Sequence, residues 1–136
     1  MTMFIHLNSD GTIAKVLHDR VIRRSNVNKI YVFAPFAPGS TVLIHFQKPN
    51  GELITGPMIF KEFNLANQIN TWEYSLMNRT ITDIAGKVLI SLEIRAITEG
   101  GVEITATPNT HMWVEESIGE LPEIEEVDEF LNLANL

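Results

Sequence analysis

The sequence of 136 residues contains no cysteine, which excludes a disulfide framework, a thiolate metal site and a cysteine nucleophile. Its N-terminus has no basic segment followed by a long apolar run, so we expect neither a signal peptide nor a membrane span. No phosphate-binding loop, dinucleotide fingerprint, nucleophile elbow or zinc-protease motif is present. These absences argue against an enzyme, and we expect no cofactor.

Basic residues are missing from the last part of the chain. Residues 1–114 hold all ten Lys and Arg and nine Asp and Glu, whereas residues 115–136 hold eight acids and no Lys or Arg. A nearly neutral body without a basic stripe argues against nucleic acid as a partner, because phosphate contacts supply much of that affinity. We interpret the only close basic cluster, Arg20, Arg23 and Arg24, as a solvated strand edge that discourages unwanted sheet pairing.

No helix of ordinary length is expected before residue 122, whereas strand patterns are frequent. The clearest strand is 41–48, where Val42, Ile44 and Phe46 alternate with more polar positions. Such a period of two is typical of a half-buried strand. Asn50-Gly51 follows it and tolerates positive φ angles at both positions, so we expect a hairpin turn into residues 52–54.

The same alternation recurs along the chain, with turn formers between the segments. Further strands are expected at 3–7, 12–18, 28–34, 72–76, 87–95, 102–107 and 111–115. Gly56-Pro57 interrupts residues 52–60, which suggests a bulge or one short kinked edge strand. The number and spacing of these segments predict one all-β domain, an antiparallel β-sandwich over residues 1–118.

Residues 119–136 begin with a linker that contains Gly119 and Pro122. From Pro122 onward the spacing of the apolar residues changes. Apolar residues then recur at spacings of three and four, which predicts a short, acidic amphipathic C-terminal helix. About two turns of apolar stripe are too short to be stable alone in water. We expect this segment to dock on the body, to associate with copies of itself or to lead into a further partner, and its expected contact residues are Ile124, Val127, Phe130 and Leu131.

Aromatic and metal-ligating residues give two alternatives to weigh. An exposed, coplanar set of Trp72, Tyr74 and Trp113 would suit sugar rings, although aromatic residues in strands are more often core residues. Each of the four histidines, His6, His18, His45 and His111, lies in a separate expected strand, and the acidic tail lacks the spacing of a calcium loop. We therefore expect no metal site.

The order of several features resembles a known family. These features are a strand leading to Pro49-Asn50-Gly51, then Trp72-Glu73-Tyr74-Ser75-Leu76, then Gly86 opening a long strand, and finally Met112-Trp113-Val114-Glu115-Glu116-Ser117-Ile118. Together they resemble the N-terminal domain of baseplate upper proteins, structural proteins from long-tailed phages of Gram-positive bacteria.

The resemblance implies a structural virion protein of a phage baseplate or tail tip, which acts as an assembly and attachment module. Such a protein would be made in the host cytoplasm and reside in the virion. Its partners would be other tail or baseplate proteins and further copies of itself, a trimer being favoured, without nucleic acid or a membrane. The alternative is a carbohydrate-binding β-sandwich that contacts the host cell wall.

Overall fold

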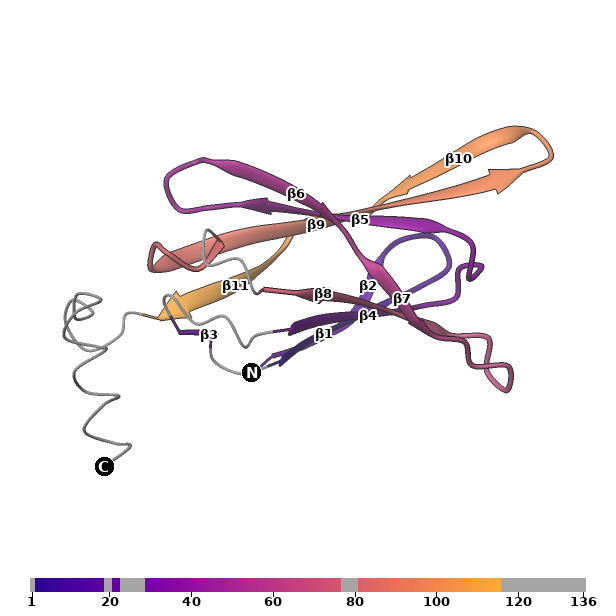
Figure 1. Cartoon of the computed structure of the whole chain (residues 1–136), viewed down its shortest axis with the longest axis horizontal. Coiled ribbons are helices and arrows are strands. Elements are labelled where there is room, and N and C mark those ends of the chain that lie inside the picture. The colour runs from indigo at the N-terminus through magenta and orange to yellow at the C-terminus, as the bar shows by residue number, and fades with distance from the viewer. Residues whose placement is uncertain (1, 19–20, 23–28, 77–80, 116–136) are drawn as a thin grey trace, which may run out of the picture.

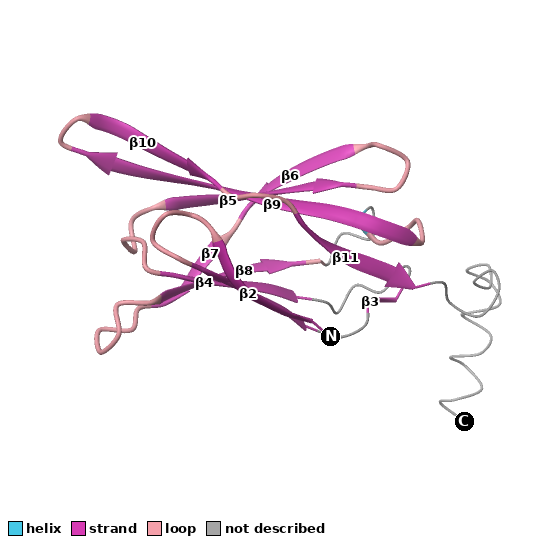
Figure 2. Ribbon diagram, turned by 180° about the vertical axis from the view of Figure 1, so that it is seen from behind, coloured by secondary structure: helices cyan, strands magenta, loops and turns pink. Residues whose placement is uncertain are grey.

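The computed structural model of the chain describes residues 2–18, 21–22, 29–76 and 81–115 (Figures 1 and 2). These residues form strands, turns and loops, and no helix occurs among them. The strands are β1 (Thr2–Leu7), β2 (Ile13–His18), β3 (Val21–Ile22), β4 (Lys29–Ala34), β5 (Thr41–Gln47), β6 (Leu53–Pro57), β7 (Ile59–Glu62), β8 (Asn70–Ser75), β9 (Gly86–Thr98), β10 (Gly101–Ala106) and β11 (Thr110–Glu115). The expectation of an all-β fold is confirmed.

The strands form two facing sheets (Figure 1). Sheet A has the order β2-β1-β4-β8-β7, and sheet B has the order β3-β11-β9-β5-β6, with β10 beside β9. The sandwich is mostly antiparallel, as predicted, but β1 pairs in parallel with β4 and β11 pairs in parallel with β3. In the first exception, β1 lies between β2 and β4. It pairs antiparallel with β2, its partner in the N-terminal hairpin, and in parallel with β4.

The inner faces of the sheets carry the apolar side chains that alternation predicts. Val42, Ile44 and Phe46 of β5 are buried, and so are four alternate residues of β9 between 88 and 94. Strand β4 lies centrally in sheet A, as expected from apolar residues on both of its faces. Burial of each large aliphatic side chain contributes about 1.5–3 kcal/mol, so this core is the main source of the fold's stability.

Two hairpin turns share one geometry. In the turn between β1 and β2, the Asn8 amide donates to the Thr12 carbonyl and the Gly11 amide donates to the Asn8 carbonyl, at 2.9 and 3.0 Å. The turn after β5 repeats this pattern between Lys48, Gly51 and Glu52. Gly11 and Gly51 have φ angles of 86° and 87°. The hairpin predicted from Asn50-Gly51 is confirmed, and of these two residues only Gly51 adopts a positive φ angle.

The segment around Gly56-Pro57 transfers the chain from one sheet to the other. Strand β6 pairs with β5 in sheet B, whereas β7 pairs with β8 in sheet A. Between them Met58 is buried, and its amide donates to the Val42 carbonyl at 2.8 Å. A Cβ atom at Gly56 would lie only 2.6 Å from the Tyr74 ring, so glycine is needed at this crossing. The expectation of one kinked edge strand or a bulge was therefore wrong, because the two halves belong to different layers.

The expected boundary between residues 118 and 119, and the expected C-terminal helix, lie outside the described residues. Within the described ranges, no helix has the length and apolarity needed to span a membrane.

Candidate interaction surfaces

The three rings proposed for sugar binding occupy different environments. Trp72 is 1% exposed between the sheets and meets Phe60 edge-on, with ring centroids 5.6 Å apart. Tyr74 is half-buried against Phe46, and burial raises the pKa of its phenol. Trp113 is 54% exposed on β11 of the opposite sheet. The structure does not bring these rings to one exposed, coplanar surface.

The other predicted site residues fall into two groups. Ile124, Val127, Phe130 and Leu131 lie outside the described residues. The four histidines lie on β1, β2, β5 and β11, one on each strand. Across residues 2–18, 21–22, 29–76 and 81–115, no three His, Asp or Glu side chains converge as a metal site.

Glu73 of β8 lies between two lysines on the outer face of sheet A. Its two carboxylate oxygens lie 3.3 Å from the Nζ atoms of Lys29 and Lys61 respectively. Burial alone would raise the pKa of Glu73, but the hydrogen bonds and charges of the two lysines outweigh it and lower that pKa. This arrangement ties β7, β8 and β4 together across the sheet, and the carboxylate is kept ionised rather than poised as a general acid.

A second polar network crosses the outer face of sheet B. Arg95 Nε donates to Glu93 Oε1 at 3.0 Å, and the other Glu93 oxygen lies 3.3 Å from His45 Nε2. The His45 Nδ1 atom lies 2.7 Å from the Thr55 hydroxyl. The Arg95 hydrogen bond, with the contact to His45, lowers the pKa of Glu93. This network links β9, β5 and β6 and holds Glu93 in its ionised form.

Lys48 is a charged residue at a buried position. Its side chain is 2% exposed, and its Nζ atom lies 2.7 Å from Asp83 Oδ1 and 3.2 Å from Glu52 Oε2. Burial lowers the pKa of Lys48, but hydrogen bonds and charges from Asp83 and Glu52 reverse the effect and raise it. The ammonium group therefore stays charged and fastens the β5–β6 hairpin to the segment before β9.

An aromatic row lies on the outer face of sheet A. Phe4 and His6 of β1 stand beside Tyr31 and Phe33 of β4, with ring centroids 4.7–5.9 Å apart and planes within 27° of parallel. These separations are close to the spacing between strands, and the small angles between the planes mean that the ring faces are turned toward one another. All four side chains are half-buried. A row packed in this way offers little free ring face for a sugar to stack on.

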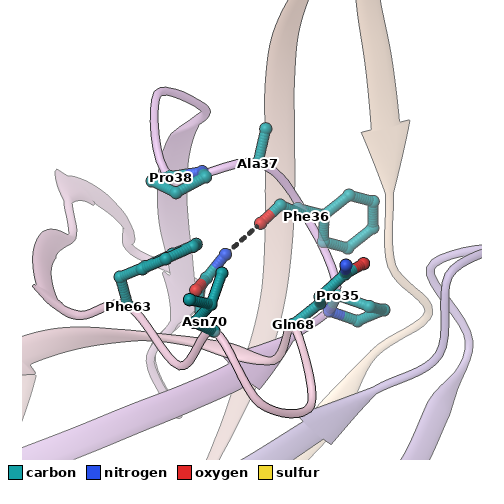
Figure 3. A pocket seen from close by; sticks show the side chains of 8 residues that line it. Pro35, Phe36, Ala37, Pro38, Phe63, Gln68 and Asn70 are labelled. Atoms are coloured by element: carbon teal, nitrogen blue, oxygen red, sulfur yellow. Dashed lines mark hydrogen bonds between the residues drawn. The ribbon is translucent and has the colours of Figure 1, made fainter.

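A small cavity lies between the loop after β4 and the loop between β7 and β8 (Figure 3). Its volume is about 210 Å³, below the roughly 300–1,000 Å³ of small-molecule sites. Asn70 Nδ2 donates to the Phe36 carbonyl at 2.7 Å and joins the two loops. The cavity is lined by Pro35, Phe36, Ala37, Pro38, Phe63, Leu65, Gln68 and Asn70. Without a charged lining residue, it suits an apolar side chain better than a substrate.

The end of β9 and the start of β10 form an arm (residues 96–104) that projects beyond the sandwich (Figures 1 and 2). Pairing of β9 with β5 ends at Arg95, so residues 96–98 pair with β10 alone. Ile97, Val102 and Ile104 are 91%, 63% and 57% exposed. Ile97 is opposite Val102, and Ile104 is opposite Arg95, which places all three aliphatic side chains on one face of the arm.

The sequence identified the arm as a hairpin, from Gly100-Gly101 and the alternation of Val102, Ile104 and Ala106, but not as a surface. Gly101 has a φ angle of 118°, as such a turn requires. Alternation shows which residues share a face, yet it does not show whether another layer covers that face. The available signal in the sequence was the position of Ile97, which is out of phase with Val88, Ile90, Leu92 and Ile94 and so falls on the opposite face of the strand.

Comparison with protein-family models and with curated protein sequences found no match for the chain.

Proposed function

We propose that this chain is a structural module of a phage baseplate or tail tip that assembles with copies of itself and with other tail proteins. The observation that carries the proposal is the placement of the exposed apolar side chains. Many of them lie on projecting elements: the arm, and the segment from β7 to β8, where Ile59, Phe63 and Leu65 are 69%, 50% and 74% exposed. Groups of exposed apolar side chains mark interaction sites.

Further support comes from the polar groups and from the predicted tail. Glu73 and Glu93 make polar contacts that connect neighbouring strands, and Lys48 pairs with Asp83 and Glu52, which is a structural use of charge. A nearly neutral body can pack against neighbours without long-range repulsion. The apolar stripe expected at Ile124, Val127, Phe130 and Leu131 would give a seam for association between tails, in the trimer favoured above.

The assembly part of the proposal is tested by mass from light scattering. The full chain should form a defined oligomer, and the chain cut after Ser117 should lose mass. Val127→Asp combined with Leu131→Asp should have the same effect, because two carboxylates in an apolar seam are costly to bury. A matched control, Glu123→Asp with Glu126→Asp, should keep the oligomer. Unchanged mass in the double Asp variant would remove the tail seam.

The virion part needs a different experiment. Antibodies raised against residues 1–118 should label the tail tips of phage particles whose genome encodes this chain, in electron micrographs. Absence of label, with the protein recovered only apart from particles, would contradict a virion role. Glycan-array binding that is lost in Trp113→Ala would instead favour the carbohydrate-binding alternative, which now has only this exposed ring of the original three.

A further inference from the structure

We infer that β10 is a self-pairing edge, at which the arm of one copy adds antiparallel to the arm of a second copy. This inference rests on the proposed function in one respect, that copies of the chain are brought together. It concerns a contact of its own, because the arm lies at the end of the body opposite to β11, from which the tail continues (Figures 1 and 2).

The edge strands of the two sheets, within the described residues, differ in how they are protected against pairing with another chain. Edge strands of natural proteins usually carry lysine or proline, or are very short, to prevent pairing with another chain. Strand β2 carries Lys15, β7 carries Lys61, β6 ends in Pro57, and β3 has only two residues. Strand β10 pairs with β9 on one side, and its sequence GVEITA contains no Lys, Arg or Pro. Of these edges, β10 is the one longer than two residues that has neither lysine nor proline, and its single charge is Glu103.

Within the part of the chain that the structure describes, the arm beyond the sandwich is a hairpin without a further strand beside it or a layer over its aliphatic face. A two-stranded ribbon is marginally stable in water and needs further strands or a packed face. The arm has two strands beyond Arg95, and its aliphatic face is exposed. At its base, the space next to Gly11 is filled by the Thr105 methyl group, which would lie 2.5 Å from an added Cβ. The base is therefore fixed on the β1–β2 turn, while an added strand would widen and stabilise the remainder.

The sequence of β10 is complementary to itself in one antiparallel register. Two copies of β10 can pair antiparallel about a twofold axis perpendicular to the sheet. This axis can pass beside residue 103, 104 or 105, which then lies opposite its own copy. Centring on Glu103 places two carboxylates directly opposite each other, which is destabilising. Centring on Ile104 places Ile104 opposite its copy, Val102 opposite Ala106, and Glu103 opposite Thr105. Centring on Thr105 pairs fewer residues, because the ladder is interrupted at Pro108, which has no amide hydrogen. The geometry therefore favours Ile104 at the axis.

The contact is weak by itself. Each cross-strand aliphatic pair contributes about 0.2–1 kcal/mol, and one six-residue strand covers much less than the roughly 800 Å² per partner of a standard interface. Its effect grows when another contact, such as the tail, already holds the copies together and raises the effective concentration of the arms. The arm then fixes how neighbouring bodies are oriented.

The absence of cysteine allows a direct test, since one introduced cysteine has no other thiol with which to react. Ile104→Cys should give a covalent dimer under mild oxidation, because directly opposed residues of antiparallel strands have Cα atoms about 4.5–5.5 Å apart, within disulfide range. Glu103→Cys and Ile97→Cys are matched controls. Residue 103 would not face its own copy, and residue 97 lies one strand further from the axis although its side chain is the more exposed.

Each outcome decides a separate point. A dimer that forms at least ten times faster with Ile104→Cys than with either control supports the inference. Equal rates for Ile97→Cys would indicate random collision or face packing and would overturn it, and a faster Glu103→Cys dimer would overturn the register. If no variant forms a dimer while light scattering still shows an oligomer, the inference fails and the proposed assembly role stands. If the oligomer is also missing, both fail.

Discussion

The aliphatic side chains in the two halves of β9 lie on opposite faces of the strand and have opposite relations to solvent. Val88, Ile90, Leu92 and Ile94 are at most 2% exposed because sheet A covers them. Three residues further on, Ile97 is 91% exposed. The first set belongs to a closed core, whereas Ile97 lies an odd number of residues beyond Ile94 and therefore on the outer face, opposite to the core. A β-branched residue therefore stabilises the fold in one half and is left exposed to solvent in the other.

This comparison separates stability from association. Apolar surface removed from water within the chain stabilises the folded state of one molecule. Apolar surface left on the arm adds little to that stability, and its contribution depends on the concentration of a partner. Substitutions in the covered half of β9 should therefore change the free energy of unfolding, whereas substitutions in the arm should change association.

The largest expected effect is in the covered half of β9. Ile90→Ala removes a fully buried side chain and should lower the free energy of unfolding by about 2–5 kcal/mol. Ile97→Ala should change it by no more than about 0.5 kcal/mol. Urea unfolding at low protein concentration measures both values. Similar losses in the two variants would mean that the arm is covered within one molecule, contrary to the comparison.

The next effect concerns Lys48, a charge inside the core region. Asp83→Asn removes the nearer of the two carboxylates that pair with the ammonium group, leaving Glu52, and should cost about 1.5–3 kcal/mol. Glu52→Gln is the control, because that carboxylate is 55% exposed and 3.2 Å away, and its loss should cost at most about 1 kcal/mol. Thermal unfolding monitored by circular dichroism shows which variant loses more stability. A larger loss for Glu52→Gln than for Asp83→Asn would contradict the assignment of Asp83 as the main partner of Lys48.

Gly56 tests the crossing between the sheets. Gly56→Ala forces a methyl group to within 2.6 Å of the Tyr74 ring and should destabilise the fold by about 1–3 kcal/mol through overpacking. Combining it with Tyr74→Leu, which makes room, should recover part of this loss. A double-mutant cycle in urea measures the coupling energy. Additive losses would show that the contact does not determine the need for glycine.

The smallest effect is the pH dependence of the outer face of sheet A. The pKa of Glu73 is lowered in the folded state, so its contribution is present above the unfolded pKa, about 4.3, and is lost as pH falls through the folded value. Glu73→Gln should flatten the stability profile below about pH 4.5, by no more than about 1 kcal/mol because the lysines are about half exposed. Urea midpoints between pH 3 and 7 test the sign, and a profile that steepens would refute it.

Local chemistry predicted much of the fold. Glycines at 11, 51 and 101 supplied left-handed turn positions, and alternation identified the inner faces of β4, β5 and β9. The crossing at Gly56-Pro57 could not be predicted, because a glycine-proline break looks the same for a bulge and for a change of sheet. The choice depends on which strand receives the chain, and that is a tertiary property.

The candidate surfaces were less predictable than the fold. Trp72, Tyr74 and Trp113 were selected by residue type, and their burial depends on which face of each strand points inward. For Trp113 that face could have been inferred, since Met112 and Val114 on either side of it are buried. The face of Ile97 could also have been inferred, since it lies an odd number of residues beyond Ile94, which is buried, whereas the face of Ile104 depends on its pairing opposite Arg95.

The central place of β9 in sheet B has a consequence for folding during synthesis. Strand β5 pairs with β9 on one side, while β10 and β11 pair with it on the other. Until residue 98 has been made, sheet B consists of the β5–β6 hairpin alone, which is marginal by itself. Pairings this far apart in sequence form slowly. The nascent chain therefore remains without a complete core until its last third emerges, and a fragment ending before Gly86 should behave as an unfolded polypeptide rather than as half a domain.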